Sequence, residues 1–310
     1  MKAIVTNDHR QFVLSEVAEP QPRPGELLVA VEAISINRGD LRLAQAQRSG
    51  FRAGWDFSGT VLQSSGRNSP PEGCRVCGLM PGLGAWGERI AVPTANLAIV
   101  PDGVTLEQAA ALPVVGLTAL YTLERFGSLL GKRVLITGAS GGVGHVAGQL
   151  ARLAGAKVTG LTRSDDGAAM LKRIGITNVA QGEGPDAAAA FGPFDAILES
   201  VGGASLGESI KLLAPRGTCL VFGASAGGAA TPIDAFAFYQ KQLNLAGFGL
   251  FPEMETGKSA AAGLARLLPL LADGRLSVDL APPRPWSAIA DVADALSARG
   301  FTGKAVLQVS

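Results

Sequence analysis

A glycine-rich run after residue 136 has the residue types and spacing of a phosphate-binding turn. It reads Thr137-Gly138-Ala139-Ser140-Gly141-Gly142-Val143-Gly144, after an apolar segment at 134–136 and before small and apolar residues at 145–154. Glycines allow a tight turn, let the backbone approach a pyrophosphate without a Cβ in the way, and let the following helix pack closely on the strand. The N-terminus of that helix offers unpaired N–H groups to an anion. The run therefore predicts a dinucleotide site in which residues 140–144 face the pyrophosphate.

The segments around this turn alternate between strand and helix patterns. Helical patterns at 145–154, 165–174 and 206–213 separate four segments with the pattern of buried strands, at 134–136, 156–162, 194–200 and 218–223. Parallel strands need crossover connections of this kind. We therefore expect an α/β fold with a doubly wound parallel sheet.

The end of the second strand indicates which dinucleotide binds. An NAD site usually places an acidic residue there for the ribose hydroxyls, but this strand ends in Leu161-Thr162-Arg163-Ser164. A guanidinium group forms charge-assisted hydrogen bonds to phosphate oxygens. Arg163 with Thr162 and Ser164 therefore favours NADPH. Arg163 as a solvated charge is the alternative, and Asp165 and Asp166 read as helix caps, although an inward-facing Asp165 would reverse the preference.

Length and composition are typical of an enzyme with two domains. The chain has 310 residues, 47% of them hydrophobic, and a formal net charge of +1. Because there is no basic stripe and no apolar run as long as a membrane span, neither nucleic acid nor a membrane is expected as a partner. Three cysteines in a chain of this length indicate a reducing compartment, and without a leader pattern we expect a cytoplasmic protein.

Two cysteines form a C-x-x-C pair that invites a zinc or redox interpretation. Cys74 and Cys77 supply two ligands, and Cys219, His9 and His145 are the remaining soft side chains, too few in suitable places for a tetrahedral site. Two small residues flanking a strand explain the pair better. No metal site is predicted.

The sequence before residue 113 has a different pattern. Short alternating segments, at 1–5, 26–31 and 57–62, are separated by stretches that contain Pro and Gly. This pattern predicts a small β-barrel-like domain. A helix at 258–271 is followed by an extended stretch, and a closing strand at 303–307 could return to the first domain. We expect one discontinuous domain, 1–112 and 275–310, and a cofactor domain, 113–274, with an Ala/Gly-rich linker near 182–193.

The chain resembles the medium-chain dehydrogenase/reductase superfamily, specifically its zinc-free quinone oxidoreductase and enoyl reductase branch. The resemblance covers nearly the whole length and rests on motifs that match in order and approximate spacing. These are Asn37-Arg38-Gly39-Asp40 (an N-x-x-D segment), Gly54-Trp55-Asp56-Phe57-Ser58-Gly59, Gly84-Ala85-Trp86-Gly87-Glu88, Ala109-Ala110-Ala111-Leu112-Pro113, Gly116-Leu117-Thr118-Ala119 and the glycine turn.

The resemblance implies a Rossmann cofactor domain, a mostly β, GroES-like catalytic domain, and NADPH-dependent hydride delivery to a quinone or an α,β-unsaturated carbonyl. It places Asn37 near the nicotinamide, as a donor to substrate or a support for the ring, and gives Asp40 a role in orienting the loop. A turn-forming role for Asn37 is the alternative. The implied cofactor shell comprises Thr118, Ser140, Gly141, Gly142, Val143, Gly144, Thr162, Arg163, Ser164, Val201, Gly202, Gly223, Ala224, Ser225, Phe248, Gly249 and Leu250. Thr118 and Phe248 could equally be ordinary packing residues.

One departure from the family pattern bears on catalysis. Many relatives have a tyrosine after the N-x-x-D segment as a possible proton donor, and residues 42–51 contain none. Water or another residue would then supply the proton. The same departure supports an alternative, a protein that binds NADPH without turnover. A short-chain dehydrogenase is excluded because Tyr121 and Tyr239 lack a lysine four residues later.

Late segments at 223–225 and 243–248 read as strands that would leave an apolar sheet edge. Such edges commonly pair across a two-fold axis. We therefore expect a homodimer.

Overall fold

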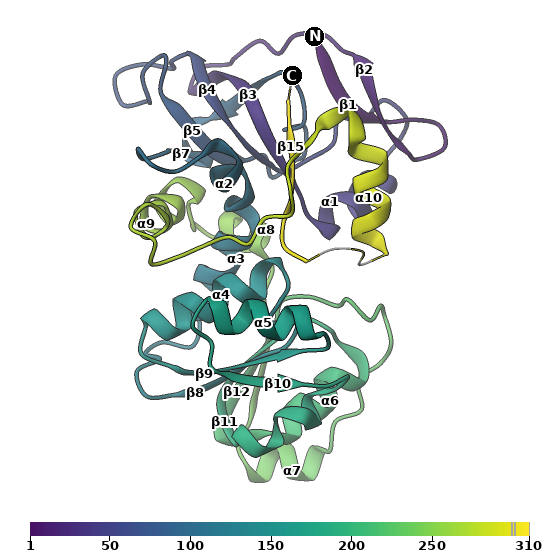
Figure 1. Cartoon of the computed structure of the whole chain (residues 1–310), viewed down its shortest axis with the longest axis vertical. Helices are drawn as coiled ribbons and strands as arrows, with labels where there is room; N and C mark the ends of the chain where they lie inside the picture. The colour runs from purple at the N-terminus through teal and green to yellow at the C-terminus, as the bar shows by residue number, and fades with distance from the viewer. Residues whose placement is uncertain (299, 301, 310) are drawn as a thin grey trace. The chain divides into compact units, whose positions relative to one another are not determined.

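The computed structural model describes residues 1–298, 300 and 302–309, which form two compact units. The first combines Met1–Leu117 with Met254–Ser310, and the second is Thr118–Glu253 (Figure 1). The first unit is therefore discontinuous, and it includes residues 113–117 and 254–274, which the sequence analysis assigned to the cofactor domain. Residues 254–274 join it because helix α9 (Ala260–Ala272) packs against strands β5 and β7 of the first unit (Arg75–Leu79 and Leu97–Ile99).

The first unit is mostly β. A seven-stranded sheet has the order β14-β15-β3-β4-β5-β7, with β6 pairing β3, and β1 and β2 form a separate antiparallel pair. The remaining strands are β1 (Lys2–Thr6), β2 (Phe12–Glu16), β3 (Glu26–Ile36), β4 (Asp56–Gln63), β6 (Arg89–Pro93), β14 (Arg284–Pro285) and β15 (Ala305–Gln308). Besides α9, its helices are α1 (Arg38–Gln45), α2 (Leu106–Ala111), α10 (Ile289–Ser297) and the short η1 (Thr94–Asn96) and η3 (Trp286–Ala288). Helices α3 (Pro113–Glu124) and α8 (Leu250–Glu255) each contain residues of both units.

Strand β3 lies at the centre of this sheet. Its side chains alternate between buried and partly exposed positions along the first part of the strand, and its last four residues are all buried. It pairs antiparallel with β4, β6 and β15. Phe57 and Trp86 are among the largest fully buried side chains around it. The return of the chain's last strand to this sheet, which the sequence predicted, sets Ala305 opposite Ile36. Residues at the start of β15 therefore lie beside the end of β3.

The second unit is a parallel sheet in the order β10-β9-β8-β11-β12-β13, as a doubly wound fold requires. Its strands are β8 (Arg133–Ile136), β9 (Lys157–Thr162), β10 (Asn178–Gln181), β11 (Phe194–Glu199), β12 (Leu213–Val221) and β13 (Asn244–Gly247). Figure 1 shows α4 (Gly142–Leu153) and α5 (Asp165–Arg173) on one side of it and α6 (Gly203–Lys211) and α7 (Ala235–Gln240) on the other.

Three local expectations were wrong. The stretch at 182–193 is not a linker, because Pro185–Phe191 forms the short helix η2, whose Pro185 and Ala188 are buried against the unit. Residues 223–225 are a loop, since β12 ends at Val221. Helix α4 begins at Gly142, inside the glycine run, and not at residue 145. None of the helices in the described part of the chain is both long enough and apolar enough to span a bilayer.

Candidate active site: a cofactor turn and a buried polar cluster

The glycine turn has the tight geometry that its sequence predicts. Gly138 adopts a left-handed conformation with φ of 59°, and the Gly141 N–H donates to the Gly138 carbonyl at 2.9 Å. A Cβ built on Gly144 would lie 2.4 Å from that same carbonyl oxygen. Only glycine therefore fits at 144 without moving the turn.

The start of α4 fits the pyrophosphate of a dinucleotide. Its N-cap is Gly141, and no side chain caps the helix. The first N–H groups of a helix have no intrahelical partner. Here the half-buried Gly142 and Val143 carry such groups beside a glycine-rich turn. An anion with several acceptor oxygens satisfies such groups, so the turn is suited to the phosphates of a nicotinamide dinucleotide.

The predicted cofactor residues of this unit, Thr118 apart, follow the carboxyl ends of five neighbouring parallel strands. Ser140 follows β8, Arg163 follows β9, and Val201 follows β11. Residues 223–225 come after β12, and residues 248–250 come after β13. Ligands of open α/β sheets bind at this edge. Thr118 lies on α3 and is buried.

Hydrogen bonds join these loops in pairs. The Ser140 and Thr162 hydroxyls are 3.0 Å apart. The Ser225 N–H donates to the Ser200 carbonyl at 3.1 Å, and the Phe248 N–H donates to the Val221 carbonyl at 2.8 Å. Because each loop is fixed to its neighbour, the edge is organised before any ligand arrives.

The residues after β9 are exposed and polar. The Arg163 guanidinium lies 3.9 Å from the Glu183 carboxylate, and both side chains are largely exposed. The N-cap of α5 is Ser164, whose hydroxyl accepts from the Gly167 N–H at 3.1 Å, so the capping role does not fall to Asp165 or Asp166. Asp165 instead accepts from Gln181 at 2.8 Å. Within the described part of the chain, the Arg163 side chain is therefore held by one long, exposed ion pair.

Glu199, at the end of β11, is a residue that the sequence did not single out. Its side chain is fully buried. Its carboxylate accepts hydrogen bonds from the Val201 N–H (3.0 Å), the Gly202 N–H (2.8 Å) and the Ser205 hydroxyl (2.9 Å). The backbone donors of Val201 and Gly202 are thus engaged inside the protein. Its position between an apolar strand and a Ser-Val-Gly-Gly turn is visible in the sequence, but its burial is not.

The first unit holds a buried polar cluster of Asn37, Asp40, Asp56 and Lys304. The Asn37 side-chain amide donates to Asp40 at 2.9 Å and to Asp56 at 2.8 Å, both through Nδ2. Its oxygen accepts from Lys304 Nζ at 2.6 Å. In this arrangement both amide protons of Asn37 are used within the cluster. Donation to a substrate oxygen would require one of these bonds to break.

Asp40 holds the turn that leads from β3 into α1. Its carboxylate accepts from the Asn37 N–H at 2.7 Å and from the Trp55 N–H at 2.8 Å. Trp55 is buried with its ring over Gly39, where a Cβ would lie 2.6 Å from the ring. Asp56 completes the set by accepting from the Val114 N–H at 2.9 Å. The cluster therefore connects the two motif segments of this unit.

Burial controls the electrostatics of the cluster. It raises the pKa of Asp40 to about 7, with a further rise from the charge of Asp56, against the lowering effect of the Asn37 donors and of Lys304. Burial likewise raises the pKa of Asp56 and lowers the pKa of Lys304. Lys304 Nζ lies 3.6 Å from Asp56. One ammonium thus compensates two buried carboxyl groups.

The cysteines do not gather with other ligands. Cys74, Cys77 and Cys219 are all free thiols, and burial raises the pKa of the Cys77 and Cys219 thiols. Metal binding requires the thiolate, which such surroundings disfavour. Among the described residues there is no group of three or more His, Cys, Asp or Glu side chains that could hold a metal ion.

Two family models match the two units. The model described as "Alcohol dehydrogenase GroES-like domain" matches residues 23–102, and the one described as "Zinc-binding dehydrogenase" matches residues 142–262. The cow protein "Quinone oxidoreductase-like protein 2" is 31% identical over 78% of this chain and 72% of its own length. The mouse protein "Prostaglandin reductase-3" is 33% identical over 84% of this chain and 74% of its own length.

Solved structures agree with these relatives. The quinone oxidoreductase from Thermus thermophilus, whose complex with NADPH has also been solved, matches with a TM-score of 0.85 and 31% identity over 99% of this chain and 100% of its own. Another relative, a "Mycocerosic acid synthase-like polyketide synthase" of Mycobacterium tuberculosis, is 31% identical over 93% of this chain, which spans only 14% of that protein's length.

The chain belongs to the medium-chain dehydrogenase/reductase superfamily as a quinone oxidoreductase-like member, which confirms the family expected from its motifs. Its relatives in this family include quinone oxidoreductases and a prostaglandin reductase, and the family is nicotinamide-dependent.

Proposed function

We propose that the protein is an NADPH-dependent reductase that delivers hydride to a quinone or to the β-carbon of an α,β-unsaturated carbonyl compound, without zinc. The observation that carries this proposal is the uncapped glycine turn at the edge of the parallel sheet, in a chain of this family. The bound dinucleotide would supply the hydride from its reduced nicotinamide ring.

The cofactor shell is proposed as the sequence predicted it. Residues 140–144 bind the pyrophosphate, and Thr162, Arg163 and Ser164 bind the 2′-phosphate. The exposed guanidinium of Arg163 supports the choice of NADPH, because its Glu183 partner at 3.9 Å is a weak competitor for a phosphate. The Ser164 hydroxyl proton is not used by its capping bond, in which the oxygen accepts.

Asn37 and Asp40 are proposed to position the junction between β3 and α1. Asp40 accepts hydrogen bonds from Asn37 and Trp55, and this network rigidly sets the backbone that follows β3. Hydride transfer requires that the protein orient the acceptor and exclude water, and a rigid wall can do both. The proton that completes reduction of an enone would come from water or from another residue, since residues 42–51 provide no tyrosine.

Turnover with artificial acceptors tests this proposal. Purified protein with NADPH and benzoquinone, phenanthrenequinone or a short alkyl enone should lose the reduced-nicotinamide absorbance, with and without a chelator of zinc. If the chelator abolished the activity and added zinc restored it, the zinc-free mechanism would be contradicted.

The second candidate is a protein that binds NADPH without turnover. Both amide protons of Asn37 are engaged by Asp40 and Asp56, and the loop after α1 lacks a tyrosine. Binding of NADPH without oxidation by any of the three acceptors would favour this candidate over the reductase.

A further inference from the structure

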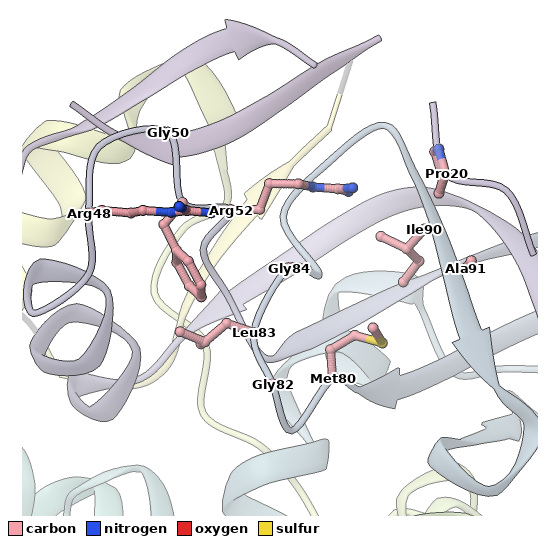
Figure 2. Close-up of a pocket in the computed structure, with 11 residues that line it drawn as sticks. Pro20, Arg48, Gly50, Arg52, Met80, Gly82, Leu83, Gly84, Ile90 and Ala91 are labelled. Atoms are coloured by element: carbon pink, nitrogen blue, oxygen red, sulfur yellow. The ribbon is translucent and has the colours of Figure 1, made fainter. Parts of the chain in front are cut away.

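The first unit carries a cavity of about 340 Å³, and its lining includes none of the residues proposed above to bind the dinucleotide or to position the substrate. Residues of this unit alone line it, from Pro20 to Ala91 in the sequence. Its lining includes the side chains of Arg48, Phe51, Arg52, Met80, Leu83 and Ile90. Figure 2 shows the Arg52 side chain extending into the space that Pro20, Met80 and Ile90 border. The volume lies at the lower end of the range for small-molecule sites.

The charged side chains that line this cavity are all positive. Arg48 and Arg52 line it, and no acidic side chain does. Arg52 is half-buried, donates through Nη2 to the Arg89 carbonyl at 3.3 Å, and has a buried Nε atom without a hydrogen-bond partner. Among the described residues neither arginine forms an ion pair, and the nearby Glu19 pairs with Arg89. A guanidinium that is half-buried and has no counter-ion leaves hydrogen-bonding capacity unused.

Burial also lowers the pKa of Arg52. The direction agrees with the geometry, because the charged form loses solvent there and gains no carboxylate in return. An arginine remains charged at neutral pH even so. A bound anion would remove the cost of this isolated charge.

The segment that carries both arginines is held in place by β1. The Gly50 N–H donates to the Thr6 carbonyl at 2.7 Å, and the Thr6 hydroxyl donates to the Arg48 carbonyl at 2.9 Å. Arg52 itself forms a β-bridge with Val5, and a Cβ on Gly87 would lie 2.9 Å from its Nη2. The guanidinium position is therefore set by backbone contacts before a ligand binds.

The rest of the lining is apolar. Met80, Leu83 and Ile90 line the cavity, together with Phe51, which precedes Arg52 in the chain. A methionine thioether packs well against aromatic rings. A carboxylate is satisfied by one guanidinium fork, and an attached hydrocarbon body suits the apolar lining, whereas a free phosphate has no apolar part.

We propose that this cavity binds a small carboxylate with a flat hydrocarbon body, whose carboxylate is held by Arg52, with Arg48 at the rim, and whose body lies against Met80, Leu83 and Ile90. The proposal concerns a ligand site separate from the dinucleotide turn and is independent of the reductase assignment.

Methyl NMR tests the site directly, because the chain has only four methionines, Met1, Met80, Met170 and Met254. The full-length protein, labelled at the methionine methyl groups, is titrated with 2-naphthoate and, separately, with the neutral isostere 2-naphthylmethanol. We expect 2-naphthoate to shift the Met80 signal saturably and leave Met170, in the other unit, unmoved. The alcohol should bind about tenfold more weakly, since it lacks the charge-assisted hydrogen bonds.

Variants locate the charge that matters. Arg52→Gln should weaken 2-naphthoate binding about tenfold, while Arg67→Gln, an exposed arginine outside the lining, should leave it unchanged. The comparison of acid and alcohol uses the unaltered protein, so it remains decisive if Arg52→Gln fails to fold. Equal affinity for acid and alcohol, an unmoved Met80 at millimolar 2-naphthoate, or unchanged binding in a folded Arg52→Gln would each overturn the proposal.

Discussion

Lys304 donates a 2.6 Å hydrogen bond to the side-chain oxygen of Asn37, 267 positions earlier in the chain. The bond joins the start of the last strand to the end of β3, and Lys304 also donates to the Ile36 carbonyl at 3.2 Å. The same ammonium is the positive charge beside Asp56 and Asp40. The closing strand therefore supplies both a hydrogen bond and charge compensation to the turn that carries the N-x-x-D motif.

Lys304→Met should destabilise the protein strongly, because it leaves buried carboxylates without their cation. Breaking a buried pair by removing one partner costs about 3 kcal/mol or more in the free energy of unfolding. Urea unfolding measures the loss, and Lys2→Met, an exposed lysine of the same unit, is the matched control. In a double-mutant cycle with Asp56→Asn, the double variant should lose less free energy of unfolding than the two single variants lose when their losses are added. Additivity within about 0.5 kcal/mol would contradict the coupling.

Asp40 should make stability depend on pH. Its pKa in the folded protein is about 7, against an ordinary value of 3.8. Between these values the folded protein binds more protons than the unfolded chain, so the free energy of unfolding falls as the pH rises from about 4 through about 7. We expect the free energy of unfolding of the wild type, minus that of Asp40→Asn, to decrease over this pH range when both are measured by urea unfolding. A difference that stays constant, or that grows with pH, would contradict the raised pKa. Asp56 and Lys304 are present in both proteins, so their own contributions to the pH dependence of stability largely cancel in this difference.

The sequence predicted the elements that local patterns determine. The turn at 138–144, the parallel strands around it and the return of the last strand all follow from glycine placement and strand periodicity. The roles of Lys304 and Glu199 could not be predicted in this way. A charged residue beside an apolar strand normally reads as exposed, and its burial depends on partners that are distant in sequence. The unit to which α9 belongs was also missed, because an apolar helix face does not indicate which sheet it will cover.

Gly144→Ala should abolish dinucleotide binding while leaving the fold intact. The added Cβ would lie 2.4 Å from the Gly138 oxygen and 2.7 Å from Ala139 Cα, both backbone atoms, so the turn must open. Overpacking of this kind costs about 1–3 kcal/mol. NADPH fluorescence titration measures the affinity, and Gly247→Ala, where a Cβ meets nothing within 4 Å, is the control. Equal affinity in both variants would remove the turn from the proposed cofactor site.

Arg163 and Glu183 should affect NADPH binding in opposite directions. Arg163→Ala removes the proposed phosphate ligand and should raise the dissociation constant for NADPH about tenfold, with little change for NADH. Glu183→Gln removes the competing carboxylate and should lower the constant for NADPH slightly. Calorimetric titration with both dinucleotides measures these effects, with Arg152→Ala, an exposed arginine of the same unit, as the control. A wild type that prefers NADH would mean that Arg163 does not face the ribose.

Strand β13 should mediate a homodimer. It is the last strand of the six-stranded sheet, so one of its edges has no strand partner in the described chain, and Leu245 on it is 38% exposed. An unprotected strand edge pairs readily with a second copy across a two-fold axis. We expect light scattering after size exclusion to give a dimer for the wild type and a monomer for Leu245→Lys. Leu130→Lys, at a leucine that is 79% exposed in the same unit, should remain dimeric. A wild-type monomer at micromolar concentration would overturn the expectation, and a dimeric Leu245→Lys would move the interface away from β13.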